Sequence, residues 1–134
     1  MPVRSLNSSV LAWPDRASVD RAVRAWATLE AKRHPGVLRI GYFGSYARGD
    51  WGVGSDLDLV AVVEDSPLPF HERAARWNIL ELPVPAELLV YTRDEWERLL
   101  ASQSRFARQL LQETVWVLAD IVQDQPGSSA PVAT

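Results

Sequence analysis

The hydrophobic residues of this chain recur with two different periods, and each period predicts one type of element. Between Val19 and Leu29, apolar side chains lie three or four residues apart, as in a helix packed on one face. Asp15 or Ser18 can cap the start of this helix, and His34-Pro35-Gly36 ends it. Apolar runs of strand length follow at Val37–Phe43, Ser55–Glu64, Ala86–Tyr91 and Val115–Leu118.

Helical patterns separate most of these strands. Phe70–Leu80 is a helix candidate that follows a turn rich in proline. Thr92 and Glu95 hold the reciprocal positions of a capping box, so a helix is expected directly after the third strand. A further helix is expected after Ser102-Gln103-Ser104. The alternation predicts an α/β (α+β) fold: a small mixed sheet with helices packed on it and the third strand beside the second.

The length and the ends of the chain predict one domain with two flanking segments. A chain of 134 residues can bury one substantial core but not two. We expect an N-terminal extension over residues 1–14, with Val10, Leu11 and Trp13 packed on the body, and a domain over residues 15–122. Residues 123–134 are rich in Pro, Ser, Ala and Gly, and we expect them to form a disordered tail.

The composition narrows the class of protein. A net charge of −3 argues against a general nucleic-acid binder, which usually needs a basic face. Cysteine is absent, which excludes disulfides and thiolate metal sites. Because no apolar run approaches membrane-spanning length and the N-terminus has too short an apolar centre for a signal peptide, we expect a cytoplasmic protein without a membrane partner.

The stretch between the first two strands carries the candidate chemistry. Gly44 allows a sharp turn, and Ser45 with the amides that follow it can present unpaired N–H groups to a phosphate. Arg48 lies one turn further on and can pair with phosphate oxygens. Asp56 and Asp58 are two residues apart on a predicted strand, so both point to one face, while Leu57 and Leu59 point into the core.

The paired aspartates predict a metal site. Two carboxylates side by side repel each other unless a proton or a cation lies between them. A hard divalent ion such as Mg²⁺ takes oxygen ligands and usually keeps a substrate phosphate in its shell. A phosphate-binding turn and a carboxylate pair at the ends of adjacent strands therefore favour nucleotidyl or phosphoryl transfer.

The same residues carry a family resemblance. This stretch resembles the signature of the minimal nucleotidyltransferases, in the DNA polymerase beta-like superfamily. That signature is Gly-Ser-x-Ala-Arg-Gly, then five residues, then Ser-Asp-x-Asp-Leu. The pattern is complete here, and its positions are Gly44, Ser45, Ala47, Arg48, Gly49, Ser55, Asp56, Asp58 and Leu59. The resemblance implies the fold of that superfamily, ATP as substrate and one or two Mg²⁺ ions. It also implies nucleotide binding by Gly44, Ser45, Arg48 and Ser55.

A third carboxylate is expected on the neighbouring strand. Glu87 opens the apolar run of the third strand, where the resembled family places its third acidic residue, more often an aspartate. With Asp56 and Asp58 it would form the catalytic and metal-binding set, and it would bind a second ion or accept the proton of the nucleophile. Glu81 is the fallback, although its position before Pro83 fits a loop better.

The resemblance implies an enzyme and also a binding partner. An acceptor hydroxyl would attack the α-phosphorus of ATP, so that AMP is transferred and pyrophosphate leaves. The acceptor could be a partner protein, because the chain has no room for a second domain that would hold it. The alternative is an antitoxin-type module that neutralises a HEPN-domain toxin, with or without catalysis, and a third reading is a nucleotide sensor. The sequence leaves open which nucleotide base is preferred, which acceptor is used and whether the protein forms a homodimer.

Several other residues could have either a structural role or a role in binding. Trp51 could stack on a nucleotide base or pack on the fold as a rim residue. Asp50 is expected to be a loop residue, His34 a helix C-cap and His71 a solvated helix residue. The tryptophans expected in the core are Trp26, Trp77, Trp96 and Trp116.

Overall fold

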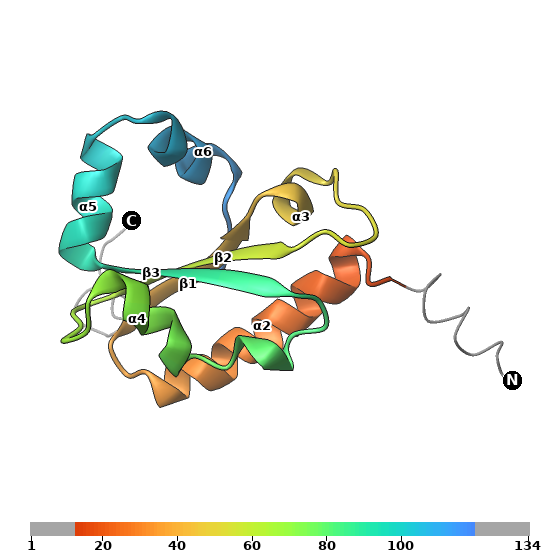
Figure 1. Ribbon diagram of the computed structural model, residues 1–134, viewed down its shortest axis with the longest axis horizontal. Coiled ribbons are helices and arrows are strands. Elements are labelled where there is room, and N and C mark those ends of the chain that lie inside the picture. Colours follow the sequence, from red (N-terminus) through yellow and green to blue (C-terminus); the bar gives the residue numbers. More distant parts are fainter. Residues whose placement is uncertain (1–12, 120–134) are drawn as a thin grey trace, which may run out of the picture.

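The computed structural model describes residues 13–119 (Figure 1). Its helices and strands alternate over most of the chain. In chain order they are α2 (Arg16–Arg33), β1 (Val37–Phe43), α3 (Ser45–Arg48), β2 (Leu57–Val63), α4 (Phe70–Arg73), the 3₁₀ helices η1 (Ala74–Arg76) and η2 (Ile79–Glu81), β3 (Ala86–Thr92), α5 (Arg93–Ala101), α6 (Arg105–Glu113) and β4 (Val115–Leu118).

The strands form one mixed sheet in the order β3-β2-β1-β4. Strand β1 is antiparallel to both of its neighbours, and β2 and β3 are parallel. The α/β fold class and the position of the third strand beside the second are therefore confirmed. Because β2 and β3 run the same way, their amino ends meet at one edge of the sheet, next to the carboxyl end of β1.

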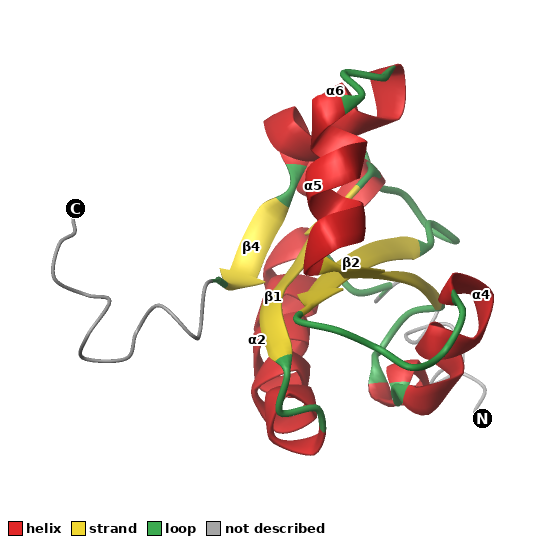
Figure 2. Cartoon of the chain, turned by 90° about the vertical axis from the view of Figure 1, so that its left-hand side faces the viewer, coloured by secondary structure: helices red, strands yellow, loops and turns green. Residues whose placement is uncertain are grey.

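Helices cover both faces of the sheet. Figure 2 shows α2 and α4 on one side of it and α5 and α6 on the other. The larger core cluster joins α2 to the first face and includes Val19, Val23, Trp26, Ile40, Leu57, Leu59 and Trp77. The smaller cluster joins α5 and α6 to the second face and consists of Leu38, Phe43, Val60, Val62, Trp96 and Leu110. Strand β2 contributes to both clusters, which explains its continuous apolar run.

Local signals set the ends of the helices as the sequence predicts. The Asp15 carboxylate accepts the Ser18 N–H at 2.9 Å, so Asp15 is the N-cap of α2. His34 is the C-cap, because its N–H donates to the Glu30 carbonyl. Thr92 and Glu95 form the complete capping box of α5. His71 lies in α4 with its side chain largely exposed.

Two predicted elements differ from the structure. The second strand starts at Leu57 instead of Ser55, so Asp56 lies just before it. The single helix predicted over Phe70–Leu80 is wrong, since α4 passes into η1 and the chain then becomes extended at Trp77. Tertiary contacts cause this break: Trp77 is buried, and the Asn78 carbonyl accepts the Trp26 indole N–H at 2.9 Å.

The structure also tests whether the predicted core tryptophans are buried and whether the N-terminal extension packs on the domain. Trp26, Trp77 and Trp96 are buried, and Trp116 is half-buried. Trp13 packs against the larger core cluster, as expected, but Val10, Leu11 and the tail at 123–134 lie outside the described residues. In residues 13–119, no helix has both the length and the apolar character needed to cross a membrane.

Candidate active site

The turn at Gly44, which leads from β1 into α3, lies against Asp58 of β2. Gly44 has φ of +79°, a conformation that glycine adopts without steric cost. A Cβ atom at this position would also collide with Oδ2 of Asp58. Helix α3 starts at the next residue, Ser45, which is half-exposed. Residue 44 is therefore restricted to glycine both by its backbone conformation and by the carboxylate beside it.

Asp58 lies at the centre of the candidate site. In the sheet register it stands opposite Phe43 of β1 on one side and Glu87 of β3 on the other. Leu57 and Leu59, its neighbours in sequence, are fully buried, so β2 turns its carboxylate away from the larger core cluster as predicted. The fold thus brings together Gly44, Asp58 and Glu87, three of the residues that the sequence singled out.

The electrostatics of Asp58 reflect its neighbours. Partial burial raises the pKa of Asp58 above its usual value, and the negative charges of Glu87 and Asp56 raise the pKa further. Arg48 lowers this pKa, while the carboxylate of Glu113 raises it slightly. The burial of Asp58 and the negative charges of Glu87 and Asp56 therefore favour a bound proton or cation at Asp58.

The donor chemistry fits a hard divalent ion, because every nearby ligand is a carboxylate oxygen. Within residues 13–119, however, no group of three or more His, Cys, Asp or Glu side chains is arranged so that it could hold a metal ion. Asp56 and Glu87 are exposed, whereas Asp58 is half-buried. The carboxylates are neighbours by backbone position, but their side chains do not converge on one point.

Arg48 is held by two carboxylates. Its Nε donates to Asp50 Oδ2 at 3.1 Å, and its Nη1 donates to Glu113 Oε2 at 3.2 Å. The bond to Asp50 is the main reason that the pKa of Arg48 is raised. Asp50 is a loop residue, as predicted, and it also neutralises the arginine that the motif assigns to phosphate.

Glu113 is a site residue that the sequence did not reveal. It is the last residue of α6, and its Oε2 accepts the Gly44 N–H at 2.6 Å. Gln109 Nε2 donates to the same oxygen at 2.8 Å. A glutamate at a helix end carries no sequence signal of this role, since the contact spans 69 positions of the chain.

The remaining predicted residues have structural roles in the loop or lie elsewhere. The Ser55 hydroxyl accepts the Gly52 N–H at 2.8 Å and so closes the loop before β2. The Trp51 ring stacks on Tyr46 with centroids 5.6 Å apart, which favours its reading as a rim residue. Glu81 lies 4.0 Å from Arg33, in the region where α2 ends. Glu87, the register partner of Asp58, therefore stays the candidate for the third carboxylate.

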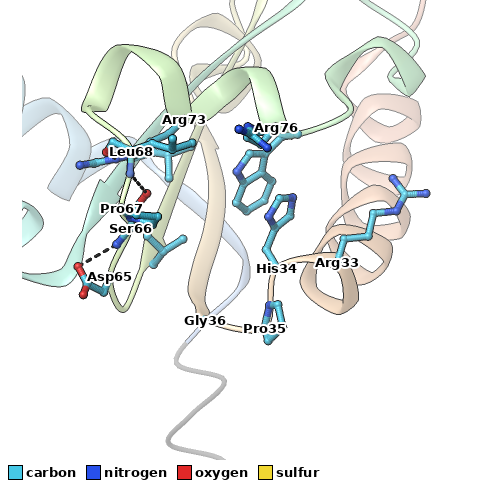
Figure 3. A pocket seen from close by; sticks show the side chains of 13 residues that line it. Arg33, His34, Pro35, Gly36, Asp65, Ser66, Pro67, Leu68, Arg73 and Arg76 are labelled. Atoms are coloured by element: carbon cyan, nitrogen blue, oxygen red, sulfur yellow. Dashed lines mark hydrogen bonds between the residues drawn. The ribbon is translucent and has the colours of Figure 1, made fainter.

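A cavity of about 340 Å³ lies at the opposite end of the sheet (Figure 3). It is lined by the loop between α2 and β1 and by residues near the ends of β2 and β3, and His34 and Arg76 face the turn that contains Asp65 across it. The cavity shares no lining residue with the motif. We therefore place the candidate chemistry at the carboxylates and assign no ligand to this cavity.

Comparison with known proteins identifies the family. A family model named nucleotidyltransferase domain matches residues 26–117, which is more than half of the chain. The chain belongs to this nucleotidyltransferase family. Membership of this family makes the protein a transferase. It also confirms the family resemblance that the sequence motif between Gly44 and Leu59 indicated. No curated protein matches its sequence.

Solved structures share the fold. A proposed nucleotidyltransferase from Sulfolobus solfataricus aligns with a TM-score of 0.55 and 18% identity, over 75% of this chain and 80% of that one. Two toxin–antitoxin structures, one with AMP-PNP and one a mutant of MntA–HpeT, align with TM-scores of 0.47 and identities of 17% and 15%. Both cover 78% of this chain and 80% of theirs, and no conclusion about this chain rests on them.

Proposed function

We propose that this nucleotidyltransferase moves AMP from ATP to an acceptor hydroxyl on a partner protein and releases pyrophosphate. One observation carries the proposal. The Asp58 carboxylate packs against the Gly44 turn and stands opposite Glu87 in the sheet. A phosphate-binding turn and two acidic groups therefore lie within one small region, which is what in-line phosphoryl transfer requires.

Each residue has a proposed task. Gly44, Ser45 and Arg48 bind the phosphates through N–H, hydroxyl and guanidinium donors, and Ser55 supports them by ordering the loop. Asp56 and Asp58 would hold an Mg²⁺ ion once their side chains turn toward a common point, and the bound ion would supply charge neutralisation at the phosphates. Glu87 would either bind a second ion or accept the proton of the acceptor hydroxyl. The new bond to the α-phosphorus forms as the bond to the bridging oxygen breaks, and pyrophosphate leaves.

A protein acceptor is favoured by an apolar surface beside Glu87. A groove of about 340 Å³ is lined by Ile79, Leu80, Leu82, Pro83, Val84, Pro85 and Ala86. It reaches the residue before Glu87, and Leu80 is 92% exposed. An apolar segment of an acceptor protein that bound this groove would bring a neighbouring hydroxyl to the carboxylates. From the resemblance, a HEPN-domain protein in the cytoplasm is the partner to test first.

Transfer can be measured with ATP labelled at the α-phosphate, Mg²⁺ and a HEPN-domain protein as acceptor. Wild-type protein should transfer label to the partner, and Asp58→Asn should not. Asp94→Asn, an exposed change on α5, is the matched control and should keep activity. Leu80→Ser should reduce labelling of the partner but leave ATP binding unchanged.

The same assay separates the alternative functions. If Asp58→Asn transferred AMP as fast as wild type, the assignment of the carboxylates would be wrong. A stable complex with the HEPN-domain protein but no transfer of label would favour an antitoxin-type binding module. Binding of magnesium ATP with neither complex nor transfer would favour a nucleotide sensor.

A further inference from the structure

The phosphate-binding turn already holds an anion that belongs to the protein. Glu113 Oε2 accepts the Gly44 N–H at 2.6 Å, a distance typical of a strong, charge-assisted hydrogen bond. The same oxygen lies 3.2 Å from Arg48 Nη1, and Gln109 Nε2 donates to it at 2.8 Å. Three donors from the turn, from α3 and from α6 therefore converge on one carboxylate whose side chain is 15% exposed.

Two of these donors are the groups that the motif assigns to the nucleotide. The Gly44 N–H has a single hydrogen, so it cannot donate fully to a carboxylate and to a phosphate oxygen at once. A triphosphate in the turn would also bring its negative charge next to Glu113 and Asp58, where like charges repel. Occupation by Glu113 and occupation by phosphate are therefore mutually exclusive at this turn.

We propose that Glu113 competes with the triphosphate for the Gly44 N–H and Arg48, and so sets how tightly this site binds phosphate. The proposal rests on the nucleotide-binding role proposed above. Displacement needs little rearrangement of the fold, because Glu113 is the last residue of α6 and its side chain can rotate away from the turn. Gln109, one turn earlier on the same helix, holds the carboxylate in place until then.

A different role predicts the opposite effect. If Glu113 stayed in place and only oriented Arg48, removing its charge would weaken phosphate binding. If Glu113 competes, removing its charge must tighten binding. The sign of the change therefore distinguishes the two roles.

The probe is inorganic pyrophosphate with excess Mg²⁺, and its binding to the full chain is measured by calorimetry. Glu113→Gln should bind pyrophosphate on the order of tenfold more tightly than wild type, because a charge-assisted bond no longer has to be broken. Glu113→Asp keeps the charge but is too short to reach the Gly44 N–H, and it should also bind more tightly. Glu97→Gln, an exposed change of equal charge on α5, should bind as wild type does.

A second measurement uses the wild-type protein alone. The amide proton of Gly44 and the side-chain amide of Gln109 should both shift in NMR spectra as pyrophosphate is added, since Glu113 leaves both donors. Unchanged Gln109 signals at saturation would overturn the proposal, whether or not the variants fold.

The remaining outcomes are equally decisive. Weaker or unchanged pyrophosphate binding by Glu113→Gln overturns the proposal, and so does a failure of both wild type and variant to bind pyrophosphate. Tighter binding by the variant without any transfer of AMP in the labelling assay supports the role of Glu113 and contradicts the proposed function instead.

Discussion

Asp58 of β2 and Glu87 of β3 are direct partners in the parallel register of the sheet. Neighbouring strands lie about 4.8 Å apart, so these two acidic residues are held close together by the backbone. The negative charge of Glu87 is, after burial, the largest cause of the raised pKa of Asp58. The fold therefore keeps two carboxylates together at an electrostatic cost, which is typical of a functional site.

Asp58→Asn should separate function from stability. We expect at least about a 100-fold loss of AMP transfer, because a charged group at the phosphates is removed. The melting temperature should stay the same or rise, since the raised pKa shows that the charged form is disfavoured in the fold. Added Mg²⁺ should raise the melting temperature of wild type and of Asp94→Asn, but not that of Asp58→Asn. A clear loss of stability in Asp58→Asn would contradict this account.

Gly44→Ala and Gly49→Ala form a matched pair. Both glycines have positive φ, but only Gly44 has a carboxylate in the way of a Cβ atom, while nothing lies within 4 Å of a Cβ at Gly49. Gly49→Ala should cost about 1 kcal/mol from backbone strain, and Gly44→Ala should cost more. Gly44→Ala should also lose transfer activity. Urea unfolding and the labelling assay test both statements, and equal effects of the two substitutions would show that the contact with Asp58 is unimportant.

The Arg73–Glu95 pair predicts a pH dependence of stability. Arg73 is buried and donates to both carboxylate oxygens of Glu95, which lowers the pKa of Glu95 to about 2. Because this pKa lies below the usual 4.5, the pair stabilises the fold fully above about pH 5. Its contribution is lost as the pH falls from there through 2.

Glu95→Gln isolates this effect, since glutamine can still complete the capping box. At pH 7 the variant should lose about 2 kcal/mol of unfolding free energy relative to wild type, and the difference should shrink as the pH approaches 2. Glu97→Gln, an exposed neighbour, should follow the wild-type curve. Unfolding by urea at several pH values measures this, and a constant difference between wild type and Glu95→Gln would contradict the assigned pKa.

Glu30 should be among the most sensitive positions outside the site. It is fully buried, and it accepts Arg33 Nη1 at 2.6 Å and the Asn78 N–H at 3.4 Å. Glu30→Ala should cost about 3 kcal/mol, because it leaves the Asn78 N–H without its acceptor and leaves a cavity where a fully buried side chain stood. Glu30→Gln keeps an acceptor and should cost less. Glu97→Ala, measured in the same way, should change stability by less than about 0.5 kcal/mol.

The sequence by itself determined most of the elements and the motif. Apolar runs set the lengths of the strands, and the capping box of Thr92 and Glu95 sets the start of α5. The turn at Gly44 needs a positive φ, which glycine adopts without steric cost. These features depend on neighbours within a few residues, so local propensity and periodicity are enough to predict them.

Only the tertiary structure decided which distant groups meet. The parallel register that pairs Glu87 with Asp58, the break of the predicted helix at Trp77, and the entry of Glu113 into the Gly44 turn all join segments far apart in the chain. Such contacts arise from strand pairing and helix packing. A single sequence without a known register holds no local signal of them, because the energies that choose them belong to the assembled sheet and core.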